Sequence, residues 1–261
     1  MNNIYLPKPY KILSILKQSE IEYLFEVEFD KDANPGQFIE VSLPMVGEAP
    51  ISITKINPSN NSIQFLIRKV GKVTDKLFDL EVGNNMFLRG PYGNGFDLDK
   101  LKGKDVVVIS GGSGLAPVRP LVNEFYKNSN FHLLMGFKDE NGILFENDID
   151  MWSKENNNIM MTLDCDNERC LVGFVTDHLE SLFNKVNKDN VKVVVVGPPL
   201  MMKFTTLDIL KLGIKEEDII VSFERNMSCA VGKCGHCKID ETYVCLEGPV
   251  FEYPKAKTLL D

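Results

Sequence analysis

Long apolar runs are absent from this sequence, and histidine and tryptophan are scarce. The 261 residues include three His and one Trp. No apolar stretch approaches the ~20 residues that a membrane-spanning helix requires. The first residues also lack the apolar core that a signal peptide carries. We therefore expect neither a membrane span nor export, and we predict a cytoplasmic protein.

Positive charge is also in short supply. Lys and Arg number 29 against 37 Asp and Glu, which gives a net charge of −8. Phosphate backbones select basic surfaces, so nucleic acid is not an expected partner. Hydrophobic residues make up 44% of the chain, as in globular proteins. At this length a single core usually stops growing, which predicts two domains and a small C-terminal module.

Four of the six cysteines form a motif near the C-terminus. Their spacing, C-x4-C-x2-C-x7-C, matches the plant-type arrangement around a 2Fe-2S cluster. Thiolate sulfur is the ligand for bridged iron, and Gly232 and Gly235 let the backbone curl close to a cluster. The motif therefore predicts a carrier of single electrons. The expected ligands are Cys229, Cys234, Cys237 and Cys245.

Other interpretations of these cysteines remain open. A structural zinc site also takes four thiolates, although zinc ribbons usually separate two C-x2-C knuckles by a long gap. His236 lies between two ligands, and we expect it to face solvent or to form a hydrogen bond instead of binding metal. Cys165 and Cys170 lie in a polar segment and are interpreted as ordinary thiols, with a redox-sensing disulfide as the alternative.

The first 97 residues contain short strand-like runs separated by Pro, Gly and Asn. Many short strands at regular spacing predict a barrel or a sandwich, and we assign residues 1–97 to this β domain. The runs are YKILSILKQ, YLFEVEF, QFIEVSL, ISITKI, SIQFLIRKV and NMFLRG.

Strands and helices alternate in residues 98–222. Helices are expected near residues 117–127, 144–154 and 176–185, and another ends near residue 212. Continuous apolar strands with helices between them predict a parallel sheet covered on both faces. Residues 223–261 then form the cysteine module. The strand runs are DVVVIS, FHLLMGF, IMMTLD, VKVVVVG and IIVSFE.

Glycine-rich loops follow two of these strands. VVVIS runs into GGSGLAP, which opens a helix, and free N–H groups at a helix N-terminus attract the pyrophosphate of a dinucleotide. The loop is not the G-x-G-x-x-G fingerprint, and alone it also fits a simple tight turn. VKVVVVG ends at the sheet edge where ligands of open α/β sheets bind. The expected contacts are Gly111, Gly112, Gly114, Ala116, Pro117, Gly197 and Pro198.

Several motifs together resemble the ferredoxin-NADP reductase superfamily over nearly the whole chain. They are P-x-S at residues 50–52, G-x-x-T at 71–74, G-P-Y-G at 90–93, GGSGLAP and VVGPP. Within that superfamily, ERNMSCAVGKCGHC and GEAPISI are most similar to the electron-transfer subunit of anaerobic sulfite reductases. The electron transfer subunit of dihydroorotate dehydrogenase and the hydrogenase gamma subunit are similar relatives.

The resemblance implies an antiparallel Greek-key β-barrel that binds FAD, a parallel-sheet α/β domain that binds a nicotinamide dinucleotide, and a small C-terminal iron–sulfur module. It places Ser52 near the reactive nitrogen of the flavin and the 73–74 turn over the pyrophosphate. The implied FAD contacts are Pro50, Ile51, Ser52, Ile67, Arg68, Lys69, Val73 and Thr74.

One position departs from the superfamily pattern. Many members carry an arginine three residues before the serine, whereas this chain has Ala49 there, preceded by Glu48. An acidic side chain would repel the FAD phosphates unless it points away, so another cation has to supply the charge. Arg68 is our candidate, and a solvent-exposed Arg68 with no such role is the alternative.

Electron counting determines the expected order of the cofactors. A reduced nicotinamide gives two electrons as a hydride and a 2Fe-2S cluster accepts one, so FAD has to lie between them. No acid or base side chain needs to act, and no catalytic side chain is predicted. Because Lys138 and Arg169 lie among acidic residues, we expect NADH more than NADPH.

The expected partners come from the resemblance alone. It implies an iron–sulfur subunit and a sirohaem catalytic subunit of a sulfite reductase complex, which turns sulfite into sulfide. An electron-transfer subunit of dihydroorotate dehydrogenase or of a hydrogenase is the alternative with another acceptor. A zinc-stabilised nucleotide-binding scaffold is the alternative from a different class.

Overall fold

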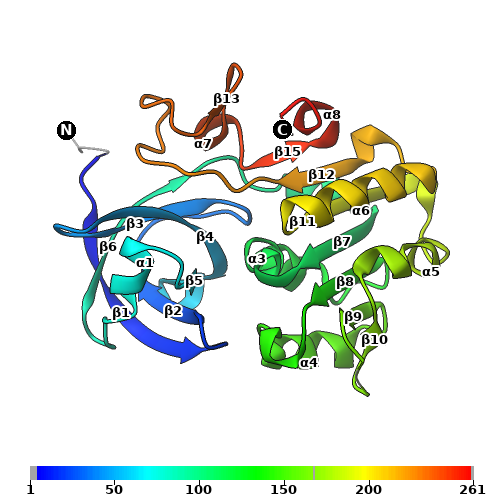
Figure 1. Ribbon diagram of the computed structural model, residues 1–261, viewed down its shortest axis with the longest axis horizontal. Helices are drawn as coiled ribbons and strands as arrows, with labels where there is room; N and C mark the ends of the chain where they lie inside the picture. The colour runs from blue at the N-terminus through cyan, green and yellow to red at the C-terminus, as the bar shows by residue number, and fades with distance from the viewer. Residues whose placement is uncertain (1–4, 167, 260–261) are drawn as a thin grey trace. The chain divides into compact units, whose positions relative to one another are not determined.

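The computed structural model describes residues 5–166 and 168–259, which form two compact units (Figure 1). Residues 5–96 and Phe223–Val250 make the first unit, and Asp97–Ser222 with residues 251–259 make the second. The cysteine-bearing tail therefore folds with the β unit as far as residue 250. No helix within the described residues has the length and apolar character needed to cross a bilayer.

The first unit is built on a closed six-stranded antiparallel barrel. The strand order is β1-β2-β5-β4-β3-β6. Alternate side chains of each strand point into the barrel, where Phe25, Ile39 and Phe65 are fully buried in one apolar core. The strands are β1 (Lys8–Lys17), β2 (Glu22–Glu28), β3 (Phe38–Leu43), β4 (Gly47–Asn57), β5 (Ser62–Arg68) and β6 (Asn85–Tyr92), and helix α1 (Lys72–Leu77) follows β5.

The tail covers part of the outer wall of the barrel. Asn94, just after β6, forms a bridge with Pro249. A Cβ atom at Gly93 would lie 2.7 Å from the Gly248 carbonyl oxygen, so the two backbones are in close contact. The tail itself contains the hairpin β13 (Lys238–Ile239) and β14 (Thr242–Tyr243), and then α7 (Val244–Glu247).

The second unit is an α/β fold around a seven-stranded sheet. The strand order is β10-β9-β8-β7-β11-β12-β15, and the strands from β10 to β12 are parallel. The strands are β7 (Asp105–Gly111), β8 (Phe131–Phe137), β9 (Ile159–Leu163), β10 (Leu171–Val172), β11 (Val191–Val196), β12 (Ile219–Ser222) and β15 (Val250–Glu252). The helices are α2 (Leu98–Leu101), α3 (Leu115–Phe125), α4 (Glu146–Glu155), α5 (Leu179–Phe183), α6 (Pro199–Lys211) and α8 (Tyr253–Ala256).

The predicted fold class is confirmed: an antiparallel barrel, a parallel α/β sheet and a tail with the cysteine motif. The structure differs in short elements. The helix expected at 176–185 is a 3-10 turn, Val175–His178, followed by α5. Strand β15, from the tail, adds to the sheet beside β12. Elements of two to six residues carry too little hydrophobic periodicity to be recognised from sequence.

A buried histidine in β8 makes the stability of the second unit depend on pH. His132 is 3% exposed, its Nδ1 has no hydrogen-bond partner among the described residues, and burial lowers its pKa. The unfolded chain therefore binds a proton more readily, and stability falls as the pH drops through the ordinary histidine range. We expect His132→Leu to have a smaller difference in melting temperature between pH 8 and pH 5.5 than the wild type, measured by calorimetry; an equal difference contradicts this.

Candidate functional site

The four cysteines of the tail come together in two pairs. The Cys234 thiol hydrogen-bonds to Cys229, and the Cys245 thiol hydrogen-bonds to Cys237. Cys237 and Cys245 are buried, Cys229 is half-buried and Cys234 is exposed. Two pairs of thiols fit the two iron atoms of a 2Fe-2S cluster, each of which takes two protein ligands. Within the described residues, no three His, Cys, Asp or Glu side chains are grouped for a single metal ion.

Backbone N–H groups surround the first of these sulfur atoms. Cys229 Sγ accepts hydrogen bonds from the N–H groups of Val231, Lys233 and Cys234, with N···S distances of 3.5, 3.3 and 3.4 Å. Burial alone would raise the pKa of Cys229, but these three hydrogen bonds stabilise the thiolate and lower that pKa to about 6. The loop therefore favours the charged form that binds iron.

The loop reaches Cys245 as well. The Gly232 N–H donates a hydrogen bond to Cys245 Sγ, with an N···S distance of 3.3 Å. Burial raises the pKa of the Cys245 thiol to about 12. An iron atom bound at this sulfur would displace the proton, and metal binding would then depend on pH. Ala230, Gly232 and Gly235 have φ values of +56°, +70° and +77°. Ala230 and Gly232 lie among the amides that donate to the sulfur atoms, and all three left-handed residues bend the backbone of this segment.

His236 lies beside the cysteines without joining them. Its ring is exposed, and Nδ1 lies 2.8 Å from the hydroxyl oxygen of Ser228. A solvent-facing, hydrogen-bonded His236 is what the sequence predicted.

The P-x-S segment lies in the middle of β4. Ile51 packs against the barrel core, so Pro50 and Ser52 on either side of it project from the outer wall. All three residues are half-buried. Pro50 is paired with Glu40 and Ser52 with Phe38 of the neighbouring strand β3. The outer face of this segment is therefore partly accessible, and its contact with the flavin stays a prediction.

The segment at the end of β5 presents different groups. The Ile67 side chain is fully buried in the barrel core, so only its backbone is available to a ligand. Arg68 is 52% exposed, and its Nε lies 3.4 Å from Glu22 Oε1. Lys69 is exposed, with its ammonium 5.8 Å from the centre of the Phe78 ring. Two cations therefore stand at this strand end, and the role of Arg68 at the FAD phosphates stays a prediction.

The G-x-x-T turn is closed by its own threonine. Thr74 Oγ1 accepts hydrogen bonds from the N–H groups of Val70 and Gly71 and donates one to the Gly71 carbonyl. Thr74 is 8% exposed and its hydroxyl is committed to the turn, so it shapes the start of α1. Val73 is half-buried beside Gly47, with which it is in close contact.

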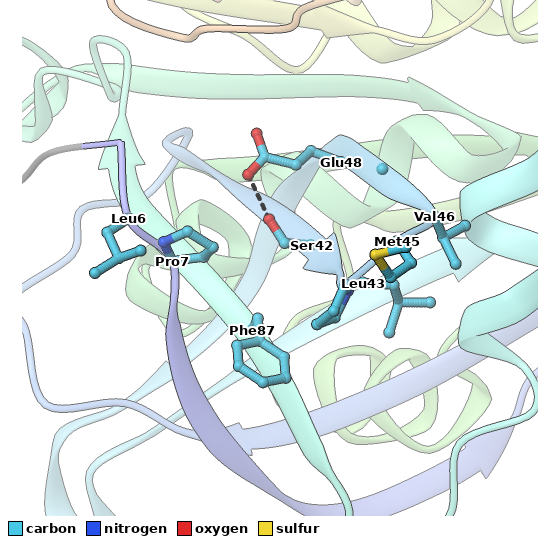
Figure 2. Close-up of a pocket in the computed structure, with 10 residues that line it drawn as sticks. Leu6, Pro7, Ser42, Leu43, Met45, Val46, Glu48 and Phe87 are labelled. Atoms are coloured by element: carbon cyan, nitrogen blue, oxygen red, sulfur yellow. Dashed lines mark hydrogen bonds between the residues drawn. The ribbon is translucent and has the colours of Figure 1, made fainter.

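Glu48, which precedes Ala49, forms an ion pair with a buried arginine. Arg89 Nε lies 2.9 and 3.1 Å from the two carboxylate oxygens of Glu48. Figure 2 shows the second contact, in which Ser42 donates a hydrogen bond of 2.5 Å to the same carboxylate. Burial opposes the shift, but these hydrogen bonds lower the pKa of Glu48. The carboxylate is therefore directed toward Arg89, which settles how an acid next to Ala49 is accommodated.

Sequence reasoning missed Arg89 and Glu40. Both are buried, at 4% and 0% exposure, and they face each other across β6 and β3. Both carboxylate oxygens of Glu40 lack a hydrogen-bond partner among the described residues, and burial raises its pKa to about 7. The only local signal was an arginine directly before G-P-Y-G, a pattern that does not distinguish a buried arginine from an exposed one.

In the second unit the two glycine loops are in contact. A Cβ atom at Gly114 would lie 2.5 Å from the Val196 carbonyl oxygen and 2.7 Å from Gly197 Cα. A Cβ atom at Gly111 would lie 3.3 Å from Pro198 Cδ. The loops after β7 and β11 therefore meet at the carboxyl edge of the sheet, as expected of a binding crevice in an open α/β fold.

The groups around this edge suit a polar ligand. The hydroxyl of Ser110, at the end of β7, is buried and has no hydrogen-bond partner among the described residues. Gly112–Gly114 forms a 3-10 turn that leads into α3, and the Leu115 N–H donates to the carbonyls of Gly112 and Ser113. The amides without a partner inside the turn are therefore those of residues 112–114. Ala116 and Pro117 are buried within α3, so their side chains support the helix and do not face a ligand.

The loop after β9 holds the remaining predicted residues. Cys165 is exposed and Cys170 is half-buried. Arg169 lies 2.7 Å from Glu146 and 3.9 Å from Asp150.

Comparison with known proteins agrees with both halves of this geometry. Residues 108–206 match the family described as "Oxidoreductase NAD-binding domain", and residues 224–256 match the "Iron-sulfur cluster binding domain of dihydroorotate dehydrogenase B". The sulfhydrogenase 1 subunit gamma of Pyrococcus furiosus is 32% identical, over 97% of this chain and 92% of that protein. A probable dihydroorotate dehydrogenase B (NAD(+)) electron transfer subunit of Methanothermobacter thermautotrophicus is 33% identical, over 96% and 91%.

Solved structures share the fold. A chain of an NADH-dependent reduced ferredoxin-NADP oxidoreductase superposes with a TM-score of 0.78 at 23% identity, over 96% of this chain and 92% of that chain. A ferredoxin NADP+ reductase from Neisseria gonorrhoeae, with bound FAD and NADP, gives 0.70 at 16% identity, over 82% and 97%. The expected cofactors, FAD, an iron–sulfur cluster and a nicotinamide dinucleotide, agree with these matches.

Proposed function

Because the chain belongs to the family of ferredoxin-NADP reductase-like electron-transfer subunits that includes sulfhydrogenase gamma subunits and the electron transfer subunits of dihydroorotate dehydrogenase B, we propose that it oxidises NADH through FAD and a 2Fe-2S cluster and passes single electrons to a partner subunit. It is an oxidoreductase subunit. A reducing, cytoplasmic setting fits a chain whose cysteines serve a metal site.

One observation carries this proposal: the two hydrogen-bonded thiol pairs in the tail. We propose that Cys229 and Cys234 bind one iron atom and that Cys237 and Cys245 bind the other. The cluster supplies a one-electron acceptor when bound. The loop contributes amides that stabilise negative charge on sulfur, which is how a protein tunes the potential of such a site. A mononuclear zinc scaffold does not explain the paired thiols.

The barrel is proposed to hold FAD along the outer wall at Pro50, Ser52 and the backbone of Ile51. FAD supplies the conversion of a two-electron donor into single electrons. The half-buried strand offers a flat surface for the ring, and the exposed Arg68 and Lys69 offer positive charge to the phosphates. Thr74 keeps the adjoining turn closed, so its amides are held in fixed directions.

The second unit is proposed to bind the dinucleotide at the joined glycine loops. The amides of the Gly112–Gly114 turn before α3 are proposed to bind the pyrophosphate. Gly114 and Gly197 allow the two loops to touch, because neither has a side chain. No proton has to be taken from or given to a substrate by this chain. Binding, orientation and exclusion of water are its contributions to the reaction.

We propose NADH as the donor. A 2′-phosphate needs a cation at the carboxyl ends of these strands. Arg169, after β9, is bound by Glu146 and Asp150, and Lys138, after β8, interacts with the Asp164 carboxylate. Asp164 lies at the end of β9, where burial raises its pKa and Lys138 counteracts that rise. A carboxylate in this position hydrogen-bonds ribose hydroxyls and repels phosphate. Steady-state rates with NADH and NADPH test this; a higher kcat/KM for NADPH contradicts it.

The acceptor is proposed from the relatives. Their names describe subunits of sulfhydrogenase and of dihydroorotate dehydrogenase B, so we propose a catalytic partner of one of these two kinds. Sulfite reductase is the second candidate, with an iron–sulfur subunit and a sirohaem subunit as partners. The similarity of residues 224–237 and 47–53 to its electron-transfer subunit favours it. Purification with the native partner, followed by assays with hydrogen, dihydroorotate and sulfite, separates the three.

Anaerobic titration with NADH tests the core of the proposal. We expect the flavin absorbance to bleach and an EPR signal of a reduced 2Fe-2S cluster to appear, with both complete at about 1.5 equivalents of NADH, because FAD takes two electrons and the cluster takes one. Iron and acid-labile sulfide should each be present at about two atoms per chain. Protein that contains zinc and neither iron nor sulfide contradicts the proposal.

A further inference from the structure

Arg89 is a buried arginine on the outer wall of the barrel. A buried guanidinium is costly unless its five N–H donors are satisfied. Here all five have acceptors. Nε and Nη2 each donate to Glu48, Nη1 donates to the Tyr92 hydroxyl at 3.2 Å, and the remaining two N–H groups reach the carbonyls of Ser228 and Cys229.

The last two contacts reach the cluster loop, defined here as residues 228–237. Nη1 lies 2.8 Å from the Cys229 carbonyl oxygen, and Nη2 lies 2.8 Å from that of Ser228. Two parallel N–H groups on one planar guanidinium therefore hold two successive carbonyls. A lysine ammonium cannot reproduce this fork, because it is a point charge without a fixed plane. One of the two held residues is the first predicted iron ligand.

The other side of Arg89 is fixed by the barrel. Glu48 belongs to β4, and Ser42 of β3 donates a hydrogen bond to its carboxylate. Glu48 is 28% exposed and lines a hollow of about 560 Å³ with Leu6, Phe87 and other residues (Figure 2). The carboxylate therefore holds the guanidinium from the solvent side, while the guanidinium reaches inward to the cluster loop.

The same group of charges borders the proposed flavin segment. Glu48 precedes Pro50 by two residues on β4. Glu40 is paired with Pro50 on one side and with Arg89 on the other, so the three lie on one face of neighbouring strands. Arg89 thus connects the strand that carries the flavin residues with the loop that carries Cys229.

We propose that Arg89 is a positioning residue that fixes the cluster loop against the flavin-bearing barrel wall and keeps a positive charge beside the cluster. This inference rests on the proposed 2Fe-2S cluster. Holding the carbonyls of Ser228 and Cys229 keeps the Cys229 sulfur among its three amide donors. The positive charge stabilises the reduced cluster, which carries one more electron, and the negative charge of Glu48 opposes this effect.

The test compares four variants of the full-length protein with the wild type. Arg89→Met removes both the fork and the charge, Arg89→Lys keeps the charge alone, and Glu48→Gln removes the opposing charge. Arg119→Met is the matched control, because Arg119 is equally buried and bound to Asp148 at 2.5 Å but lies in α3 of the other unit. The readouts are the cluster reduction potential, from an EPR-monitored titration, and hydrogen exchange in residues 228–237.

Arg89→Met is expected to lower the equilibrium constant for cluster reduction about tenfold, a shift of about 59 mV to lower potential. Glu48→Gln is expected to shift the potential the opposite way. Hydrogen exchange in the cluster loop should increase in both Arg89 variants, whereas Arg119→Met changes neither readout. If Arg89→Met does not fold, Arg89→Lys still tests the fork through hydrogen exchange.

Two outcomes overturn the inference in distinguishable ways. In the first outcome the wild type contains the cluster, and in both Arg89 variants the equilibrium constant for cluster reduction and the hydrogen-exchange rate of the cluster loop stay within twofold of the wild type. Arg89 is then a structural ion pair only, and the proposed function stands. Shifts of the same sign in Arg89→Met and Glu48→Gln also contradict the electrostatic role. If the wild type contains no iron or sulfide, the proposed function fails and the inference fails with it.

Discussion

Cys245→Ser protein is expected to lose its iron–sulfur cluster while it keeps FAD and still reacts with NADH. Cys245 is 1% exposed in α7 and accepts a hydrogen bond from Gly232 of the cluster loop, and the two cysteines outside the motif belong to the other unit. Serine is a poor ligand because its hydroxyl does not deprotonate readily and is not a soft donor. We expect iron content to fall more than about tenfold, since even changes behind the ligands cost 10- to 100-fold in affinity.

Cys165→Ser provides the matched control. It makes the same chemical change at an exposed cysteine of the other unit. Iron, labile sulfide, flavin spectrum and NADH-dependent reduction of a two-electron dye and of a one-electron acceptor should be measured for both variants. We expect Cys245→Ser to lose only the cluster and the reduction of the one-electron acceptor. Full iron content in Cys245→Ser would contradict the assignment of this residue as a ligand.

Gly114→Ala is expected to produce the opposite defect, with the cluster retained and the reaction with NADH lost. The added Cβ would lie 2.5 Å from the Val196 carbonyl oxygen and 2.7 Å from Gly197 Cα, both of which are backbone atoms that cannot rotate away. The two loops have to separate, at a cost of about 1–3 kcal/mol. Because a misplacement of about 1 Å can cost 100-fold in rate, flavin reduction by NADH should slow by at least about tenfold.

Gly142→Ala is a suitable control in the same unit. A Cβ there would meet only Asp139 Oδ1, at 3.8 Å, which is ordinary contact. Stopped-flow reduction of the flavin by NADH should be unchanged in this variant, and dithionite should reduce the cluster in both. A Gly114→Ala protein that folds and is reduced by NADH at the wild-type rate would show that the joined glycine loops do not bind the dinucleotide.

Much of the site could be predicted because its parts are local in the chain. The predicted ligands Cys229, Cys234 and Cys237 lie within nine residues, so their spacing alone restricts the geometry of a metal loop. Gly111–Gly114 follows a buried strand directly, and a strand that ends in glycines before a helix has few possible shapes. The six barrel strands were recognised for the same reason, since apolar alternation is read within a few residues.

For other predicted residues, only the structure shows what the side chain contacts. Ile67 and Thr74 were expected to contact FAD, but one side chain lies in the barrel core and the other closes its own turn. Their proposed contribution is therefore through the backbone. The acceptor is a third case: the tail most resembled the electron-transfer subunit of sulfite reductases, whereas the relatives described above are sulfhydrogenase and dihydroorotate dehydrogenase subunits.

The sequence by itself determined the glycine loops and the order of barrel and α/β sheet, and it predicted the cysteine ligands, because each depends on residues that are close in the chain. Only the tertiary structure decided the environment of Arg89, whose carbonyl partners are 139 and 140 residues away and whose carboxylate partner is 41 residues away. An arginine loses its hydration on burial and is stable there only when folding brings acceptors to every N–H group. No local pattern records where those acceptors come from.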